Sequence, residues 1–237
     1  MVASESGAPS RRHDVDWLRS IALVLLIVYH AMISFQSYAD KIHFPQAPNF
    51  IEALGPIMEW LSIWRIPLLF VISGMGTAFA LRRRTVGELA GDRTRRFLEP
   101  LFFGTFAVVP LNGLFLQFYN GIPVENITYD FHHGHLWFLG YLPGYVILTL
   151  PLIAAVKKFP EGRGLRLLAS GLHVRSMVLI FFCVLFALEA WLMDPQNFSF
   201  WPTRFGAGWL CFGFGFLMVS IGQSFWDAIE RDRWVYA

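Results

Sequence analysis

Six apolar runs, each long enough to cross a membrane, dominate this chain of 237 residues. The runs cover approximately residues 17–36, 58–81, 97–118, 136–156, 176–193 and 204–222. A hydrocarbon core about 30 Å thick is crossed by about 20 residues of apolar helix, and lipid offers backbone groups no other partner. The sequence therefore predicts an all-α fold, a polytopic membrane helical bundle of about six transmembrane helices. With 55% apolar and only 15% charged residues, the chain is not an ordinary soluble domain.

The basic residues predict how this bundle is oriented. Lys and Arg gather before the first run, between the second and third, between the fourth and fifth, and after the sixth. The alternate loops 37–56, 119–134 and 194–203 contain only Lys41. Because cytoplasmic loops carry the excess of basic residues, both termini are expected in the cytoplasm. The expected organisation is a cytoplasmic tail 1–15, a transmembrane domain 16–223 and a cytoplasmic tail 224–237.

Ionisable side chains within the first two runs are the candidate site residues. Arg19 and His30 are eleven positions apart, so a helix places them on one face about 16 Å apart along its axis, and Asp16 shares that face. Charges inside a membrane are costly and usually mark a site. The alternative is that Arg19 is an interfacial anchor and His30 a hydrogen-bonded bundle residue. Arg65, beside Pro67 in the second run, is expected to face the bundle interior, with pairing to an acidic residue (Asp16, Glu59 or Glu99) as the competing interpretation.

Four blocks carry a family resemblance. They are Asp16–His30, with its Leu-Arg-x-Ile-Ala pattern; Arg65-Ile66-Pro67-Leu68-Leu69-Phe70-Val71-Ile72-Ser73-Gly74; Arg93–Leu101, with an Arg-x-x-Arg element; and Gly134-His135-Leu136-Trp137-Phe138-Leu139. In this order they resemble the motifs of the acyltransferase-3 superfamily of integral-membrane O-acyltransferases. The resemblance covers about residues 12–145, and the glucan biosynthesis protein C-like branch looks nearest.

The resemblance implies an enzyme of the inner (plasma) membrane that moves an acetyl or succinyl group from cytoplasmic acyl-CoA to a hydroxyl of a surface or periplasmic carbohydrate. The partners it implies are acyl-CoA, a carbohydrate or glycolipid acceptor and the lipid bilayer, with no nucleic acid, no bound cofactor and no metal. Acyl transfer needs a base and a stabilised oxyanion. The catalytic candidates are His30 as base with Arg19 and Asp16; acyl-CoA would be bound by Arg65, Arg93 and Arg96; and His135 and Trp137 would face the acceptor.

The chain departs from the family pattern in two ways. Leu142 stands where many carbohydrate O-acetyltransferases of the family have a glutamate five residues after the tryptophan of the fourth block, so that residue's role does not carry over. Family members usually have about ten spans, so the six expected here suggest the N-terminal part of the family fold or an abbreviated member. An inactive remnant is therefore one alternative function. A second is a non-catalytic transporter of a small anion or glycan, because intramembrane charges alone allow it.

Overall fold

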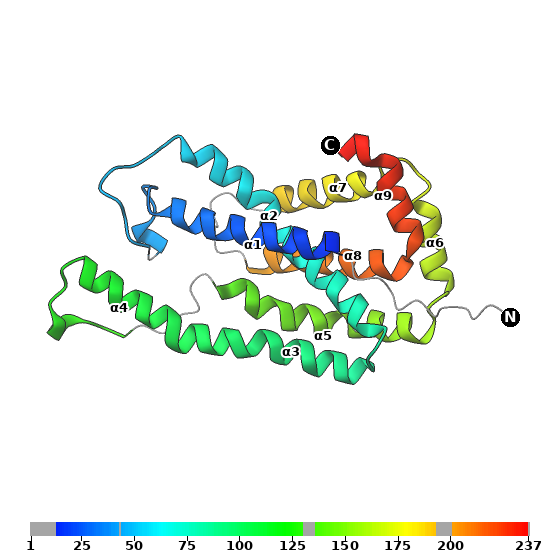
Figure 1. Ribbon diagram of the computed structural model, residues 1–237, viewed down its shortest axis with the longest axis horizontal. Coiled ribbons are helices and arrows are strands. Elements are labelled where there is room, and N and C mark those ends of the chain that lie inside the picture. Colours follow the sequence, from blue (N-terminus) through cyan, green and yellow to red (C-terminus); the bar gives the residue numbers. More distant parts are fainter. Residues whose placement is uncertain (1–12, 43, 130–135, 193–200, 237) are drawn as a thin grey trace.

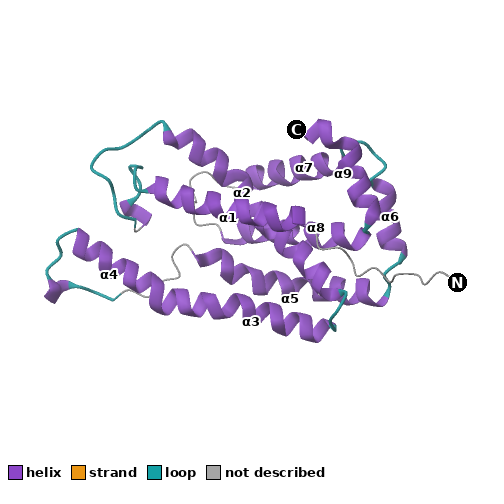
Figure 2. Cartoon of the chain, in the orientation of Figure 1, coloured by secondary structure: helices purple, strands orange, loops and turns teal. Residues whose placement is uncertain are grey.

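The computed structural model describes residues 13–42, 44–129, 136–192 and 201–236, and every regular element in these ranges is a helix (Figures 1 and 2). The main helices are α1 His13–Ile33, α2 Leu54–Leu81, α3 Val86–Phe103, α4 Val109–Tyr119, α5 Trp137–Lys158, α6 Arg163–Gly171, α7 Met177–Leu192, α8 Trp201–Ile221 and α9 Gln223–Tyr236. The expected all-α polytopic bundle is confirmed.

Each of the six apolar runs forms a helix, but not all of these helices are long enough to cross a membrane. By length and composition, α1, α2, α5 and the continuous α3–α4 rod qualify. The rod passes from α3 to α4 through a π-helical stretch, Gly104–Val108. The helices α8 and α9 meet at 105° and count as at most one further span. The described part of α7 has 16 residues, fewer than a span normally needs. The described residues therefore supply four or five candidate spans, where the sequence predicted about six.

Glycine residues let α2 and α8 pack with their backbones in close contact. A Cβ added at Gly74 would overlap the carbonyl oxygen of Phe212, and one added at Gly215 would overlap that of Val71. Such close approach is typical of small residues at helix interfaces in membranes. A Cβ at Gly206 or Gly213 would instead meet nothing within 4 Å. Of the four glycines in α8, Gly208 and Gly215 therefore lie at close helix contacts and Gly206 and Gly213 do not.

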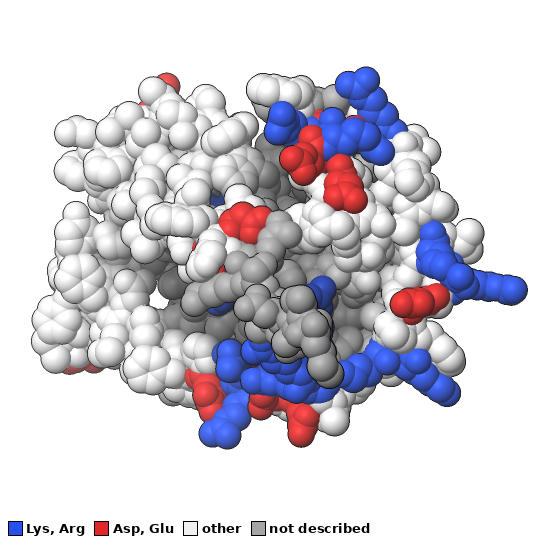
Figure 3. Space-filling model, turned by 45° about the vertical axis from the view of Figure 1, so that its right-hand side comes forward, with Lys and Arg blue, Asp and Glu red and all other residues white. Residues whose placement is uncertain are grey.

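Basic side chains gather at one end of the bundle, which we call the basic end. It contains Arg82, Arg83, Arg84, Arg93, Arg95, Arg96, Lys157, Lys158, Arg163, Arg166, Arg175, Arg231 and Arg233. Figure 3 shows the blue side chains toward the right and along the lower edge, while the left-hand side is white. In Figure 1, α6 and α9 run across this end, roughly perpendicular to the other helices. The basic end thus combines charge with two helices suited to a membrane surface.

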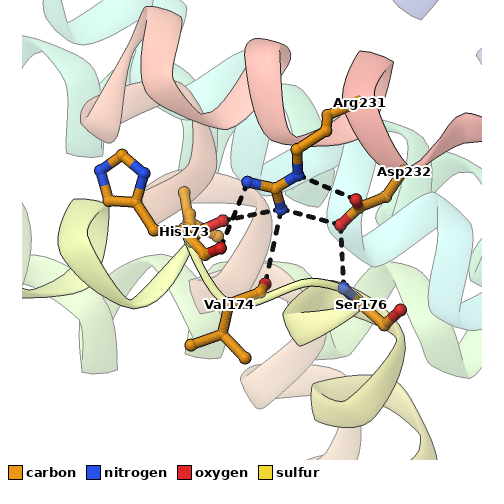
Figure 4. A network of polar contacts seen from close by, with 6 residues as sticks. His173, Val174, Ser176, Arg231 and Asp232 are labelled. Atoms are coloured by element: carbon orange, nitrogen blue, oxygen red, sulfur yellow. Dashed lines mark hydrogen bonds and ion pairs between the residues drawn. The ribbon is translucent and has the colours of Figure 1, made fainter.

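Helix α9 is docked by a polar network, although its residues were expected to form a tail (Figure 4). Asp232, only 1% exposed, accepts a hydrogen bond of 2.8 Å from the backbone N–H of Ser176. Arg231 donates to Asp232 and, at 3.0 Å, to the carbonyl oxygen of Leu172. Ser176 has a φ of 63°, so this turn between α6 and α7 is tight. The network fixes α9 against the turn.

Candidate functional site

A cavity of about 720 Å³ opens at the basic end, and we call it the arginine pocket. Six arginines line it, together with one acidic residue: Arg19, Arg82, Arg83, Arg84, Arg93, Arg96 and Asp16. Gly222, Gln223 and Trp226, where α8 turns into α9, also line it. Guanidinium groups are planar forks that match the oxygens of phosphate and carboxylate. The arginine pocket is therefore suited to a ligand that carries several negative charges.

The start of α3 is fixed by a capping box, which sets the direction of its arginines. The Thr85 hydroxyl accepts a hydrogen bond from the Glu88 N–H at 3.3 Å, and the Glu88 carboxylate accepts one from the Thr85 N–H at 2.9 Å. This pairing satisfies two backbone donors that a helix start otherwise leaves free. Arg93 and Arg96, three residues apart and thus neighbours on one face, both line the arginine pocket.

Arg93 is held against α2 at a glycine. Its Nη2 donates to the carbonyl oxygen of Gly76. A Cβ added at Gly76 would lie 3.3 Å from the same nitrogen, so the absence of a side chain gives the guanidinium its place. Arg95, between the two pocket arginines, instead forms an exposed ion pair with Glu99 and does not line the pocket. The contrast makes Arg95 a natural control for its neighbours.

His30 lies half-buried near the opposite end of α1. Its Nδ1 is 2.7 Å from the carbonyl oxygen of Leu26, one turn earlier. A carbonyl oxygen can only accept, so in the neutral ring Nδ1 carries the proton and Nε2 carries the lone pair. The ring stacks on Phe44, with centroids 5.7 Å apart, and meets Tyr29 edge-on at 5.8 Å. The geometry leaves Nε2 as the basic atom of this side chain.

The loop after α1 folds back over this region. Ile33, Ala39 and Met58 form a small core of their own, and Tyr29 and Phe44 pack against it. Burial raises the pKa of the Tyr38 phenol above its ordinary value, and the neighbouring Tyr29 acts in the same direction. Phe44 belongs to this loop, and its packing on the small core places its ring against that of His30.

Arg65 is a buried cation with incomplete hydrogen bonding. It is 2% exposed, and its Cζ lies 4.0 Å from the centroid of the Tyr29 ring. Among the described residues, its Nε and Nη1 have no hydrogen-bond partner, and it forms no ion pair. The competing expectation of pairing with an acidic residue is thus not met in the described chain. Since an unpaired buried donor is costly, Arg65 is a candidate to bind a carbonyl or anionic group.

The contact between α1 and α2, which we call the seam, extends from the arginine pocket to the level of His30 and Arg65. On α1, Arg19 and His30 are eleven residues apart, and on α2, Arg65 and Gly76 are also eleven apart. The chain runs away from the basic end along α1 and back toward it along α2, and the two helices are in contact. Arg19 is therefore at the level of Gly76, and His30 at the level of Arg65. At 1.5 Å per residue each spacing is about 16 Å. On α2, Ser73 stands between Arg65 and Gly76 in the sequence, and its hydroxyl is buried and without a hydrogen-bond partner in the described part of the chain.

The structure separates the expected catalytic and donor-binding residues into two groups. Arg19, Asp16, Arg93 and Arg96 line the arginine pocket. His30 and Arg65 lie toward the other end of the seam and interact electrostatically. Asp16, expected among the catalytic residues, is therefore not placed beside His30.

Of the two residues expected to face the acceptor, the structure describes only Trp137. Trp137 begins α5 and packs on Tyr141, with ring centroids 5.1 Å apart. His135 lies outside the described residues, as do the neighbouring His132 and His133. The acceptor side therefore stays a sequence prediction.

Four residues at the site were not anticipated. Gly76 seats Arg93, and Trp226 lines the arginine pocket from α9. Tyr29 lies under Arg65, and Phe44 stacks on His30. Tyr29 precedes His30 directly, so its position was available from the sequence, whereas the approach of Phe44 depends on the folded loop.

Comparison with known proteins agrees with the sequence motifs. A family model described as an acyltransferase domain, that of the acyltransferase-3 family, matches residues 12–225. No curated protein and no solved structure gives a significant match. The match is to the family as a whole, and the glucan biosynthesis protein C-like branch stays a prediction. Since the match covers most of the chain, the protein belongs to the acyltransferase-3 family and is a multi-pass membrane acyltransferase.

Proposed function

We propose that this acyltransferase takes a short acyl group, acetyl or succinyl, from acyl-CoA bound at the arginine pocket and transfers it to a hydroxyl of a carbohydrate or glycolipid. The observation that carries the proposal is the seam. It has six guanidiniums at one end, and at the other His30, with a basic Nε2, and Arg65, which has no ion pair among the described residues. The two ends match the two chemically different parts of an acyl-CoA.

The arginine pocket fits the charged part of the donor. CoA carries several phosphate charges, and the six arginines outnumber Asp16 and Asp92, which pairs with Arg84, so the pocket keeps an excess of positive charge. Arg96 and Arg19 would contact phosphate oxygens, while Arg93, anchored on Gly76, would present its remaining N–H groups. A guanidinium already held in place loses less freedom when the ligand binds.

The seam fits the other part of the donor. CoA holds its thioester at the end of a long flexible pantetheine arm with amide groups along it. An arm that enters between α1 and α2 would carry the thioester about 16 Å from the pocket, to the depth of His30 and Arg65. The Ser73 hydroxyl, without a described partner, would meet an amide of the arm on the way.

The chemistry then follows from the two groups at the far end. Nε2 of His30 takes the proton of the acceptor hydroxyl, whose oxygen attacks the thioester carbonyl carbon. Arg65 donates hydrogen bonds to the oxyanion that forms. As the intermediate collapses, the new C–O bond remains and the C–S bond breaks. The CoA thiolate leaves with the proton that His30 had taken, which restores the neutral ring.

The direction of transfer follows from charge. Cytoplasmic regions carry the excess of Lys and Arg, so we assign the basic end to the cytoplasm of an inner (plasma) membrane, with both termini on that side. Acyl-CoA would enter from there. The acceptor would approach from the opposite side, where a carbohydrate or glycolipid at the cell surface or in the periplasm is available.

The test replaces His30 by Ala in the native gene and follows labelled acetate, then labelled succinate, into glycan and lipid fractions. His173→Ala is the matched control, because that side chain is exposed at the basic end. The proposal expects one labelled ester to disappear in His30→Ala and to persist in His173→Ala at equal protein level. Unchanged labelling by both precursors would overturn it, and solute flux without bond exchange would identify a transporter instead.

A further inference from the structure

A second cavity lies on the other side of α8, between α5, α6, α7 and α8, and takes no part in the seam. Its volume is about 730 Å³, and its lining is almost wholly hydrocarbon. Val178, Leu185 and Met218 form its wall and are buried, which distinguishes it from a convex surface facing lipid. On α1, by contrast, Ile27 is 70% exposed. We call this cavity the apolar groove.

The apolar groove extends over the depth of one leaflet. Its lining on α8 extends from Trp209 to Ile221, which are twelve positions and about 18 Å apart along the helix. Half of a hydrocarbon core is about 15 Å. The groove ends at α6 and Phe225, at the basic end. It therefore begins at a membrane surface and stops near the middle of the bilayer.

The polar groups at the inner end of the groove are already paired. The Trp209 Nε1–H donates to the Thr149 hydroxyl at 3.0 Å, and that hydroxyl donates to the carbonyl oxygen of Tyr145 at 2.6 Å. A ligand at this depth would find no polar partner to contact. The groove is suited to a hydrocarbon chain and unsuited to a sugar or a nucleotide.

Helix α6 closes the surface end of the groove and carries positive charge. Leu168 and Leu172 line the groove, while Arg163 and Arg166 lie outside its lining and are exposed. Neither arginine is in an ion pair within the described chain. An amphipathic helix across the end of a bundle (Figure 1) is typical of an element in the membrane interface. Basic residues there attract anionic lipid head groups.

We propose that the apolar groove binds one acyl chain of an anionic glycerophospholipid from the leaflet at the basic end, whose phosphate is bound by Arg163 and Arg166. The depth of the groove fits a lipid of that leaflet, its dry lining fits the chain, and the charges of α6 fit the head group. The site is separate from the arginine pocket, so the inference holds whatever the acyl acceptor is.

The binding of the lipid acyl chain is tested by a substitution that fills the apolar groove. Gly213 lines it, and a Cβ there meets nothing within 4 Å, so Gly213→Phe occupies the space without a backbone clash. Gly206→Phe is the matched control, because Gly206 is equally open on the same helix but does not line the groove. If Gly213→Phe is not recovered folded, Gly213→Leu replaces it.

The probes are phosphatidylglycerol and phosphatidylcholine with identical chains, added to the purified full-length chain and counted by native mass spectrometry. One phosphatidylglycerol should be retained by the native protein and by Gly206→Phe, with at least tenfold less retained by Gly213→Phe. Equal retention by the two glycine variants would overturn the proposal.

The binding of the lipid phosphate is tested by substitutions of the two arginines of α6. Arg163→Gln combined with Arg166→Gln should make retention of the two lipids equal, whereas Arg233→Gln, an exposed arginine at the same end, should keep the preference for phosphatidylglycerol. A native protein that retains both lipids equally, or a preference that survives the double substitution, would overturn the assignment of the phosphate to these arginines.

Discussion

Arg65 should lower the stability of the fold and be necessary for acyl transfer. Its replacement by Met should therefore raise the free energy of unfolding and lower the rate of transfer. Met is similar in length and apolar, and it fills the space without a charge. Two nitrogens of the buried guanidinium, Nε and Nη1, have no described hydrogen-bond partner, and each such unsatisfied donor costs about 1–3 kcal/mol. Replacement by Met removes this cost, but it also removes the contact of the guanidinium with the Tyr29 ring, which stabilises the native protein by about 2 kcal/mol.

The difference predicts that Arg65→Met raises the free energy of unfolding by about 2 kcal/mol, using central values for both terms. For a chain of this size that corresponds to a Tm about 4–8 °C higher. Acyl transfer should fall by about 10²–10³, as when one oxyanion donor is removed. Thermal unfolding followed by tryptophan fluorescence in one detergent, and label incorporation in cells, measure the two effects.

Arg95→Met is the control, because Arg95 is an exposed arginine whose single ion pair contributes little. It should leave both Tm and transfer near their native values. A lower Tm for Arg65→Met would show that the guanidinium is bound by the protein itself, and undiminished transfer would remove it from the reaction. Either result would contradict the role assigned to Arg65.

The remaining predictions concern the pocket, the helix packing and α9. Gly76→Ala should displace the guanidinium above it and raise KM for acyl-CoA about fivefold with kcat unchanged, the loss of roughly one hydrogen bond, whereas Gly87→Ala should not. Gly215→Ala should lower the free energy of unfolding by about 1–3 kcal/mol through overpacking, while Gly206→Ala should be neutral or stabilising in the same unfolding assay. Asp232→Asn should weaken the docking of α9 by about 1–3 kcal/mol and expose it to limited proteolysis.

Much of the fold was predictable because the membrane restricts what an apolar run can form. Each run became a helix, and the distribution of arginines located the basic end. The relation between Arg19 and His30 followed from helical periodicity alone. Hydropathy and helical periodicity sufficed here, because an apolar run in lipid can satisfy its own backbone hydrogen bonds only as a helix.

Other features depend on contacts between distant segments and were not predictable. The α8 sequence contains four similar glycines, but which of them meet α2 depends on how α8 is rotated, and only Gly208 and Gly215 do. The turn of 105° into α9 depends on Gly222, whose φ is +83°, and on the docking of Asp232. Residues 224–237 mix three acidic residues with two arginines, and this pattern gave no sign of the turn or of the docking.

The candidate site was predictable in its residues and not in their grouping. Arg93 and Arg96 were found by their motif, and the structure places them with Arg19. The proton on Nδ1 of His30 depends on the hydrogen bond to the Leu26 carbonyl. Every helical histidine has a carbonyl one turn earlier, but not every one forms this hydrogen bond, so the sequence alone did not predict it. Phe44 reaches His30 only through the fold of its loop.

The most direct test of the account is the affinity of the purified protein for CoA after single arginine substitutions. Arg96 lines the arginine pocket and Arg95, its neighbour, does not. If the pocket binds the phosphates, Arg96→Gln should raise the Kd by about 10–100-fold, the loss of one charge-assisted hydrogen bond, and Arg95→Gln should leave it within about twofold. Equal Kd values for the two variants would contradict the assignment of the donor to the arginine pocket.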